Sequence, residues 1–190
     1  MLLFLDVVSS IPEFSLIEDN KVILRRKIIR EENEKLSDNI FEVYTQINKE
    51  VNLQQNLEKI SITIGPGSYT SLRVGASFVS GLKINNKILY YAFSVNDIFN
   101  LKSNQYKKNN IGIFISSANK QKFFCSLDSK KKPNCIKIED KEFTLPDNIE
   151  IIFYNHEEIN SKQKIVKQTK FSFFELFFNN HRNFNFSENE

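Results

Sequence analysis

Three strand patterns precede the first helix pattern in this chain, and that order restricts its fold more than any other feature. Residues 2–8 form an apolar run typical of a buried strand, and residues 13–18 and 21–29 suit two further strands. Asp19 and Asn20 join the last two strands, and both residue types tolerate the left-handed backbone of a tight hairpin. A doubly wound nucleotide-binding fold would instead open with strand, helix and strand.

Helix and strand patterns alternate after this opening. The expected elements are a helix over 37–51, a strand over 59–64, a helix over 68–82, a strand over 88–93 and a short helix to residue 101. Ser37 or Asp38 is suited to cap the first helix, and Ser94 with Asp97 has the spacing of a capping box. Asn85-Asn86 should end the second helix. The order β-β-β-α-β-α-β-α is that of a ribonuclease H-like half-domain, which is an α/β fold.

A polar, basic stretch at residues 105–110 separates the two halves of the chain. We therefore expect a first subdomain over 1–104 and a second, smaller one over 105–190. The second half shows strand patterns at 111–116 and 122–127, a turn at Asn119-Lys120 and weaker strand patterns at 135–138 and 150–154. A helix is expected within 171–178, and the polar end at 181–190 is expected to fray.

Composition excludes several classes of protein. The chain has 26 basic and 23 acidic residues, and its net charge of +3 is too small for a strongly basic nucleic-acid binder. No apolar run approaches the roughly 20 residues of a membrane span, and the short run at 2–8 carries Asp6 and indicates a strand rather than a signal peptide. We expect a cytoplasmic protein.

The two cysteines do not indicate a metal site. Cys125 and Cys135 lack CxxC spacing, and the chain has only two histidines, His156 and His181. A structural zinc site needs about four ligands, so no metal is expected. Two isolated cysteines are typical of small buried side chains in a reducing compartment.

Gly65-Pro66-Gly67 is the sharpest local signal in the sequence. It stops the strand at 59–64 and leads directly into the next helix, with Gly67 suited to a positive φ and Ser68 or Thr70 to the helix cap. A helix N-terminus of this kind can hold an anion. However, neither the GxxxxGK[ST] nor the GxGxxG spacing is present, which favours a tight turn with a capped helix and no ligand.

The helix that follows is unusually rich in small residues. Glycine inside a helix costs about 1 kcal/mol relative to alanine, so Gly75 and Gly81 need a reason. Together with Ala76, Ser77 and Ser80 they allow another backbone to approach closely. That backbone belongs either to the chain's own sheet or to a partner's helix, and spacing alone leaves both readings open.

The segment GPGSYTSLRVGASFVSGL resembles the signature of TsaB/YeaZ proteins, which typically reads GPGSFTGLRIG before an Ala/Gly-rich helix. The residues on motif positions are Gly65, Pro66, Gly67, Ser68, Thr70, Leu72, Arg73 and Gly75. Tyr69 replaces a usual Phe, and Ser71 replaces a usual Gly. Asp6 corresponds to the Asp that ends the family's first strand. The resemblance is specific over about twenty residues, and the element order extends it to residue 104.

This resemblance implies an actin/Hsp70-like (ribonuclease H-like) fold and a role as a non-catalytic scaffold. TsaB-like proteins bind the catalytic subunit TsaD and, with the ATPase TsaE, support transfer of a threonylcarbamoyl group to a tRNA adenosine. Contact with tRNA is then indirect, no cofactor belongs to the chain itself, and ATP or ADP is expected only at a subunit interface through the partners.

The resemblance also implies which residues meet the partner, because TsaB-like chains pair through two N-terminal helices, here 37–51 and 68–82. The implied partner-binding residues are Ile40, Tyr44, Ile47, Leu72, Arg73, Gly75, Ala76 and Val79. The implied motif loop is Gly65, Pro66, Gly67, Ser68, Tyr69 and Thr70. The family, rather than the spacing, favours the partner reading of Gly75 and Ala76.

The residues themselves offer no catalytic set. ATPases of this fold hold phosphates on a glycine-containing turn after the first strand, but residues 6–12 contain no glycine. Both histidines lie late in the chain, so no Ser/His/Asp arrangement can be assembled. Two alternatives stay open: an active ATPase or sugar kinase of the same superfamily, and a homodimeric binding module without a tRNA role that pairs through the same helices.

Overall fold

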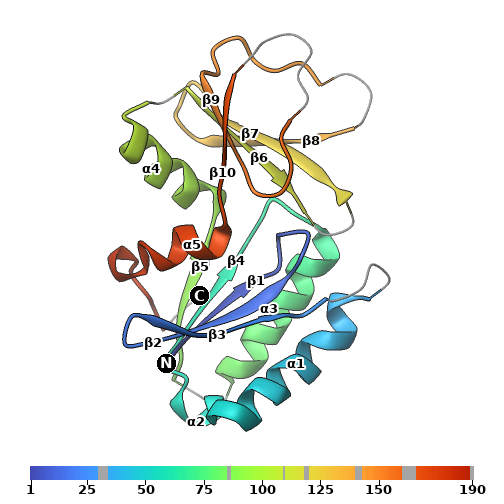
Figure 1. Ribbon diagram of the computed structural model, residues 1–190, viewed down its shortest axis with the longest axis vertical. Coiled ribbons are helices and arrows are strands. Elements are labelled where there is room, and N and C mark those ends of the chain that lie inside the picture. Colours follow the sequence, from blue (N-terminus) through green and yellow to red (C-terminus); the bar gives the residue numbers. More distant parts are fainter. Residues whose placement is uncertain are drawn as a thin grey trace.

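Two five-stranded sheets, one from each half of the chain, form the frame of the molecule (Figure 1). The computed structural model describes residues 1–29, 34–84, 87–108, 110–117, 120–139, 143–159 and 166–188. The first sheet has the order β3 (Lys21–Lys27), β2 (Glu13–Glu18), β1 (Leu2–Asp6), β4 (Lys59–Thr63) and β5 (Leu89–Phe93). The second has the order β10 (Lys167–Lys170), β9 (Ile151–Tyr154), β6 (Ile111–Ser116), β7 (Lys122–Leu127) and β8 (Pro133–Ile138).

Both sheets have the same topology. In the first, β1 pairs antiparallel with β2 and parallel with β4, and the outer strands β3 and β5 continue each side. In the second, β6 pairs antiparallel with β7 and parallel with β9, and β8 and β10 continue each side. Each half therefore combines a three-stranded meander with two parallel strands. The order predicted for the first half is confirmed, and the second half repeats it at the level of strand connections.

Two long helices cover one face of the first sheet. α1 (Leu36–Val51) is followed by the single-turn α2 (Leu53–Asn56), and α3 (Tyr69–Lys83) lies beside α1 (Figure 1). Leu3 and Leu5 of β1 point to this face and are fully buried. The alternating period of the strand places Leu2 and Phe4 on the opposite face, in a different cluster of buried side chains.

The two halves exchange their remaining helices. α4 (Val95–Tyr106) follows the first sheet but contacts β6 and β8 of the second, with the rings of Tyr106 and Phe153 5.1 Å apart. α5 (Phe173–Phe178) follows the second sheet but packs on β1 of the first, where the Phe177 ring lies 4.6 Å from that of Phe4. One continuous apolar core therefore contains side chains from both halves.

Several local predictions are confirmed. Asp19 and Asn20 have φ values of 48° and 61°, as expected for this hairpin. Ser94 and Asp97 form a complete capping box, although α4 continues to Tyr106 rather than stopping at residue 101. The α1 cap is different from the prediction, because Lys35 occupies the N-cap position and its side chain makes no capping hydrogen bond. The Asn85-Asn86 helix stop and Asn119 of the predicted turn lie outside the described residues.

The polar C-terminal stretch was expected to fray, and this is wrong for the part that the structure describes. A 3-10 helix, η2 (His181–Asn183), follows α5, and Ser187 then pairs with Tyr90 at the edge of β5. The Phe184 ring stacks on Tyr91 at 4.6 Å, so burial of aromatic side chains holds this segment against the first sheet.

The expectation of two separate cysteines is also wrong. Cys125 on β7 and Cys135 on β8 occupy directly opposite positions in the antiparallel pair and form a disulfide. The weak pattern at 135–138 did not define the register of β8, and without the register their pairing could not be foreseen. No helix among the described residues has the length and apolar character needed to cross a membrane.

Candidate partner-binding surface

The Gly65-Pro66-Gly67 turn packs closely against the loop after β1. Gly65 has φ of +104°, so the positive φ falls there and not at Gly67 as predicted, and the Gly65–Pro66 peptide bond is cis. A Cβ on Gly67 would lie 3.5 Å from the Val8 side chain, so the turn sits directly on the loop after β1. Ser68 caps α3 as predicted, because its hydroxyl accepts a hydrogen bond from the backbone N–H of Ser71.

The inner face of α3 packs on its own sheet. A Cβ on Gly75 would lie 2.8 Å from Ile62 Cδ1 and 2.9 Å from Val7 Cγ1, distances that real side chains do not adopt. Gly75 is therefore small because the helix approaches β4 and the loop after β1, and the own-sheet reading is correct at this position. Phe78 and Val79 continue the buried face.

This packing corrects part of the predicted partner-binding set. Ile40, Ile47 and Gly75 lie in the core and present no surface to a partner, and Val79 is also buried, although it lines a surface hollow. Helical spacing finds the apolar face of a helix, and that face is the one a helix turns toward its own sheet.

The other four residues of that set reach the surface to different extents. Tyr44 and Leu72 are half-buried, whereas Arg73 and Ala76 are exposed. Whether these four contact a partner stays a prediction.

The outer face of α3 is exposed. It carries large apolar side chains at both ends and small side chains between them. Tyr69 is 71% exposed at the first turn and Ile84 is 78% exposed just after the last. Arg73 lies over the Tyr69 ring, with 5.2 Å between its guanidinium carbon and the ring centre. Between them lie the small exposed residues Ala76, Ser77, Ser80 and Gly81. A Cβ on Gly81 would meet no atom within 4 Å, so packing within the chain does not require this glycine.

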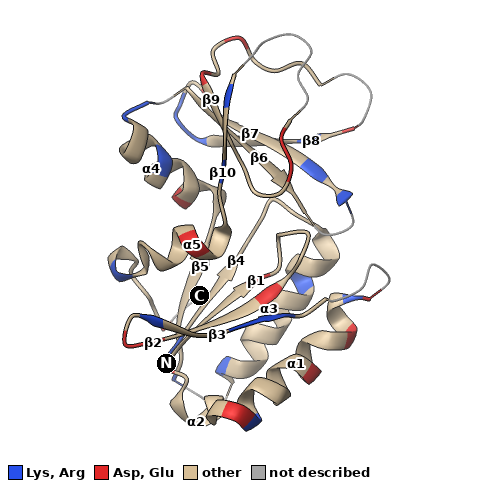
Figure 2. Cartoon of the chain, viewed as in Figure 1, with Lys and Arg blue, Asp and Glu red and all other residues tan. Residues whose placement is uncertain are grey.

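α1 adds aromatic side chains to the same side of the molecule. The Phe41 ring is 64% exposed and lies 5.3 Å from Phe78, which Tyr44 also contacts at 5.3 Å. We define the α1–α3 surface as Phe41, Tyr44, Tyr69, Arg73, Ala76, Ser77, Ser80, Gly81 and Ile84. The two helices differ in charge (Figure 2), because α3 carries two basic residues and no acid, whereas α1 carries three acids and one lysine.

A hollow of about 440 Å³ lies at the C-terminal end of this surface. Ala76, Val79 and Ser80 of α3 line it, and Tyr90 of β5 closes it from the sheet side. The Lys83 ammonium lies 5.1 Å from the centre of the Tyr90 ring. A concave, partly apolar end next to exposed Ile84 is a shape that a protruding side chain of another protein would fill.

Asp6, at the end of β1, is fully engaged by its own chain. Its Oδ1 accepts hydrogen bonds from the N–H groups of Val8 (2.9 Å) and Ser9 (3.1 Å) and from the Thr63 hydroxyl (3.1 Å), and its Oδ2 accepts from the Ser9 hydroxyl (2.5 Å). Burial raises the pKa of Asp6 above its ordinary value, and the hydrogen bonds oppose that rise. This arrangement fixes the turn between the two sheets, where Ser9 pairs with Ser117 of the second half.

Comparison with known proteins places this geometry in a family. The family described as TsaD, tRNA N6-adenosine threonylcarbamoyltransferase, matches residues 28–189. The chain belongs to this family. The match includes α1, the Gly-Pro-Gly turn, α3 and the described part of the second half, so it extends well beyond the segment that carried the sequence resemblance.

Two solved structures that resemble the chain are of the YeaZ type. The chain resembles YeaZ from Pseudomonas aeruginosa at a TM-score of 0.53 and 14% identity, covering 80% of this chain and 74% of that one. It also resembles a protein described as uncharacterized with similarity to peptidase YeaZ from Pseudomonas aeruginosa, at a TM-score of 0.62 and 13% identity, covering 98% and 94%. A comparison with curated proteins finds no match.

These findings confirm the TsaB/YeaZ resemblance and the actin/Hsp70-like fold class. The duplicated strand order of the two sheets agrees with that fold, in which two similar half-domains face each other. Between β8 and β10 the described residues form no helix, and a reduced second subdomain over 105–190 stays a prediction.

Proposed function

We propose that this chain is a non-catalytic scaffold subunit of a tRNA threonylcarbamoyladenosine-modifying complex, and that it binds a TsaD-like catalytic subunit through the α1–α3 surface. The observation that carries the proposal is the outer face of α3. There, exposed Tyr69, Arg73 and Ile84 flank a run of small residues whose glycine, Gly81, the chain's own packing does not require.

The chemistry of this surface suits a partner helix. Small side chains let two helix backbones approach closely, and aromatic and arginine side chains supply most of the energy in typical interfaces. Phe41 and Tyr69 each present a large apolar ring to water, and removal of such surface from water contributes about 25 cal/mol per Å². The basic outer face of α3 favours a partner helix that carries acidic residues at its rim.

A scaffold role is supported by how the loop after β1 is filled. Val7 and Val8 are fully buried beneath Gly75 and Gly67, and all the hydrogen bonds of Asp6 come from its own turn and from Thr63. The turn is thus occupied by its own side chains. In this proposal the TsaD-like partner supplies the chemistry and most of the tRNA contact, a TsaE-like ATPase completes the assembly, and any ATP or ADP lies at a subunit interface.

Pairing with the cognate TsaD-like subunit is the direct test. Gly81→Leu fills open space, so the fold should tolerate it, but the new side chain blocks a close approach. We expect association, measured by isothermal titration calorimetry, to weaken roughly 10-fold or more, which is about 1.4 kcal/mol. Asn100→Leu, on the exposed side of α4, is the matched control and should bind like the wild type.

Two results would contradict the proposal: no association of the wild-type pair, or equal affinity of the wild type and Gly81→Leu. Self-association of the isolated chain would not distinguish the scaffold from a homodimeric binding module, because both use this surface. Loss of threonylcarbamoyladenosine from tRNA on depletion of the chain, restored by the wild type and not by Gly81→Leu, separates the two.

A further inference from the structure

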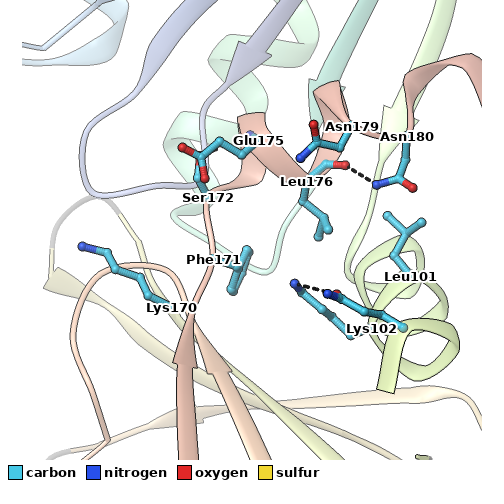
Figure 3. Close-up of a pocket in the computed structure, with 10 residues that line it drawn as sticks. Leu101, Lys102, Lys170, Phe171, Ser172, Glu175, Leu176, Asn179 and Asn180 are labelled. Carbon is cyan, nitrogen blue, oxygen red and sulfur yellow. Dashed lines mark hydrogen bonds between the residues drawn. The ribbon is translucent and has the colours of Figure 1, made fainter. Parts of the chain in front are cut away.

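A second cavity, of about 350 Å³, lies where the exchanged helices α4 and α5 meet (Figure 3). It is separate from the α1–α3 surface, on the other side of the first sheet. Leu101, Lys102 and Gln105 of α4 form one wall, and Glu175 and Leu176 of α5 with Asn179 form the other. Lys170, Phe171 and Ser172 close the cavity where β10 leads into α5.

Lys102 is the unusual residue of this cavity. Only 8% of its surface is exposed, and burial lowers the pKa of its ammonium. Its nearest polar contact is a long one, 3.4 Å to Oε1 of Gln105, and it lies 4.9 Å from the centre of the Phe153 ring. No carboxylate among the described residues forms an ion pair with it.

A buried ammonium without a counter-ion destabilises a fold, since a buried charge needs a partner to offset its lost hydration. An ammonium has three N–H donors, and among the described residues only one of them has an acceptor. In Figure 3 the ammonium end of Lys102 lies at the cavity. The two remaining N–H donors can therefore be met by an acceptor placed in the cavity.

The other lining groups define the charge that such a ligand can carry. Lys170 also lines the cavity, but Figure 3 shows its ammonium end pointing away from Lys102. Glu175 adds an acid, and its carboxylate is turned toward Ser172 and away from Lys102 (Figure 3). A dianion such as phosphate would meet only one cation directed at the cavity, Lys102, and would be repelled by Glu175. A monoanion balances the site with one buried cation.

We propose that this cavity binds a small organic carboxylate, whose charged head pairs with Lys102 and whose apolar body contacts Leu101, Phe171 and Leu176. The volume suits this class, because pockets for small organic ligands begin at about 300 Å³. The Asn179 amide, at the edge of the cavity, is a further donor within the lining. The inference does not depend on the proposed scaffold function.

Binding of simple carboxylates to the intact chain tests the proposal. Acetate, isobutyrate, benzoate and succinate are titrated, with inorganic phosphate and neutral benzamide as comparisons. The readouts are calorimetry and the side-chain amide NMR signals of Gln105, Asn179 and Asn180. We expect at least one carboxylate to bind and to shift these signals. Lys102→Met should weaken that binding at least about 10-fold, and Lys137→Met, on exposed β8, should leave it unchanged.

The fold of the variant is checked by its melting temperature without ligand, which should equal or exceed that of the wild type because a buried charge is removed. Three results would overturn the proposal: no Lys102-dependent response to any of the four carboxylates, equal binding of benzamide and benzoate, or binding of phosphate as tight as that of the best carboxylate.

Discussion

Two buried charges show how a single residue's surroundings decide its role. Asp6 and Lys102 are both almost fully buried, at 4% and 8% exposure. Asp6 is met by four hydrogen bonds from its own chain, whereas Lys102 has one long contact to Gln105. A buried polar group whose bonding capacity is filled is part of the structure, whereas one whose capacity is left open needs an explanation, and for Lys102 the proposed explanation is a ligand.

The role of Asp6 is tested by comparing Asp6→Asn with Asp6→Ala. Asparagine keeps an oxygen that can accept the three hydrogen bonds now donated to Oδ1. Its amide can donate a hydrogen bond to the Ser9 hydroxyl. Alanine leaves those buried donors without an acceptor. We expect Asp6→Ala to lower the free energy of unfolding by about 3 kcal/mol or more, and Asp6→Asn by less than about 1 kcal/mol, in urea titrations at neutral pH. Equal losses in the two variants would contradict a structural role.

Comparison of the wild type with Asp6→Asn also predicts how the free energy of unfolding depends on pH. Because burial raises the folded-state pKa of Asp6 above 3.8, the folded chain keeps this proton in a pH range where the unfolded chain has lost it. The stability of the wild type relative to Asp6→Asn should therefore be greatest at low pH. It should fall as pH rises from 3.8 through the folded-state pKa, and a relative stability that rises over this range would contradict the assignment.

At the scale of elements, α3 shows that one helix can carry two glycines for different reasons. Gly75 faces Ile62 and Val7, and its Cβ would come within 3.0 Å of both. Gly81 faces open space. We expect Gly75→Ala to destabilise the fold by about 1–3 kcal/mol through overpacking. Gly81→Ala should stabilise it by up to about 1 kcal/mol through helix propensity. Thermal unfolding of both variants checks this, and the opposite order would show that the faces of α3 are assigned wrongly.

The sequence predicts elements well where a local rule sets them. The Asp19-Asn20 hairpin, the Ser94–Asp97 capping box and the Ser68 cap were all expected, because each depends only on neighbouring residues. The sequence predicts elements poorly where residues distant along the chain determine the local structure. β10 has no apolar pattern, since Lys167–Lys170 is polar throughout, with two exposed ends and two half-buried middle residues at a sheet edge. The C-terminal segment is polar, and two backbone hydrogen bonds between Ser187 and Tyr90 hold it at the edge of the first sheet.

The candidate surface, too, was predicted correctly only in part. Apolar spacing located α1 and the Gly-Pro-Gly turn located the start of α3, but the partner-binding residues implied by the family resemblance included Ile40, Ile47 and Gly75, which build the core. Phe41 and Ile84 were not chosen, although they are among the most exposed apolar side chains. An apolar residue off the buried stripe was the available signal, since Phe41 follows Ile40 directly and therefore lies about 100° around the helix. Lys102 gave no signal, because residues distant in the sequence, such as Phe153, lie around it in the folded chain.

At the scale of the whole molecule, the exchange of α4 and α5 joins the halves more closely than the sequence boundary near residue 105 suggests. Phe4 and Phe93 belong to the first sheet, but Phe177 of α5 covers both, with ring centres at 4.6 and 5.6 Å. Phe153 belongs to the second sheet, and Tyr106 of α4 covers it. Each sheet therefore depends on a helix that the sequence order assigns to the other half.

This dependence predicts that the first half does not fold alone. A fragment of residues 1–106 keeps α1 and α3 on one face of the first sheet, but it lacks α5 and therefore exposes Leu2, Phe4 and Phe93 on the other face. We expect it to bind the dye ANS and to lose near-ultraviolet circular dichroism while it keeps helical signal, as expanded compact states do. In the full chain, Phe177→Ala should cost about 3–5 kcal/mol, whereas Phe41→Ala, which removes an exposed ring, should cost about 1 kcal/mol or less. A cooperative unfolding transition of the 1–106 fragment, with dispersed NMR signals, would show instead that the first sheet is stable with one face uncovered.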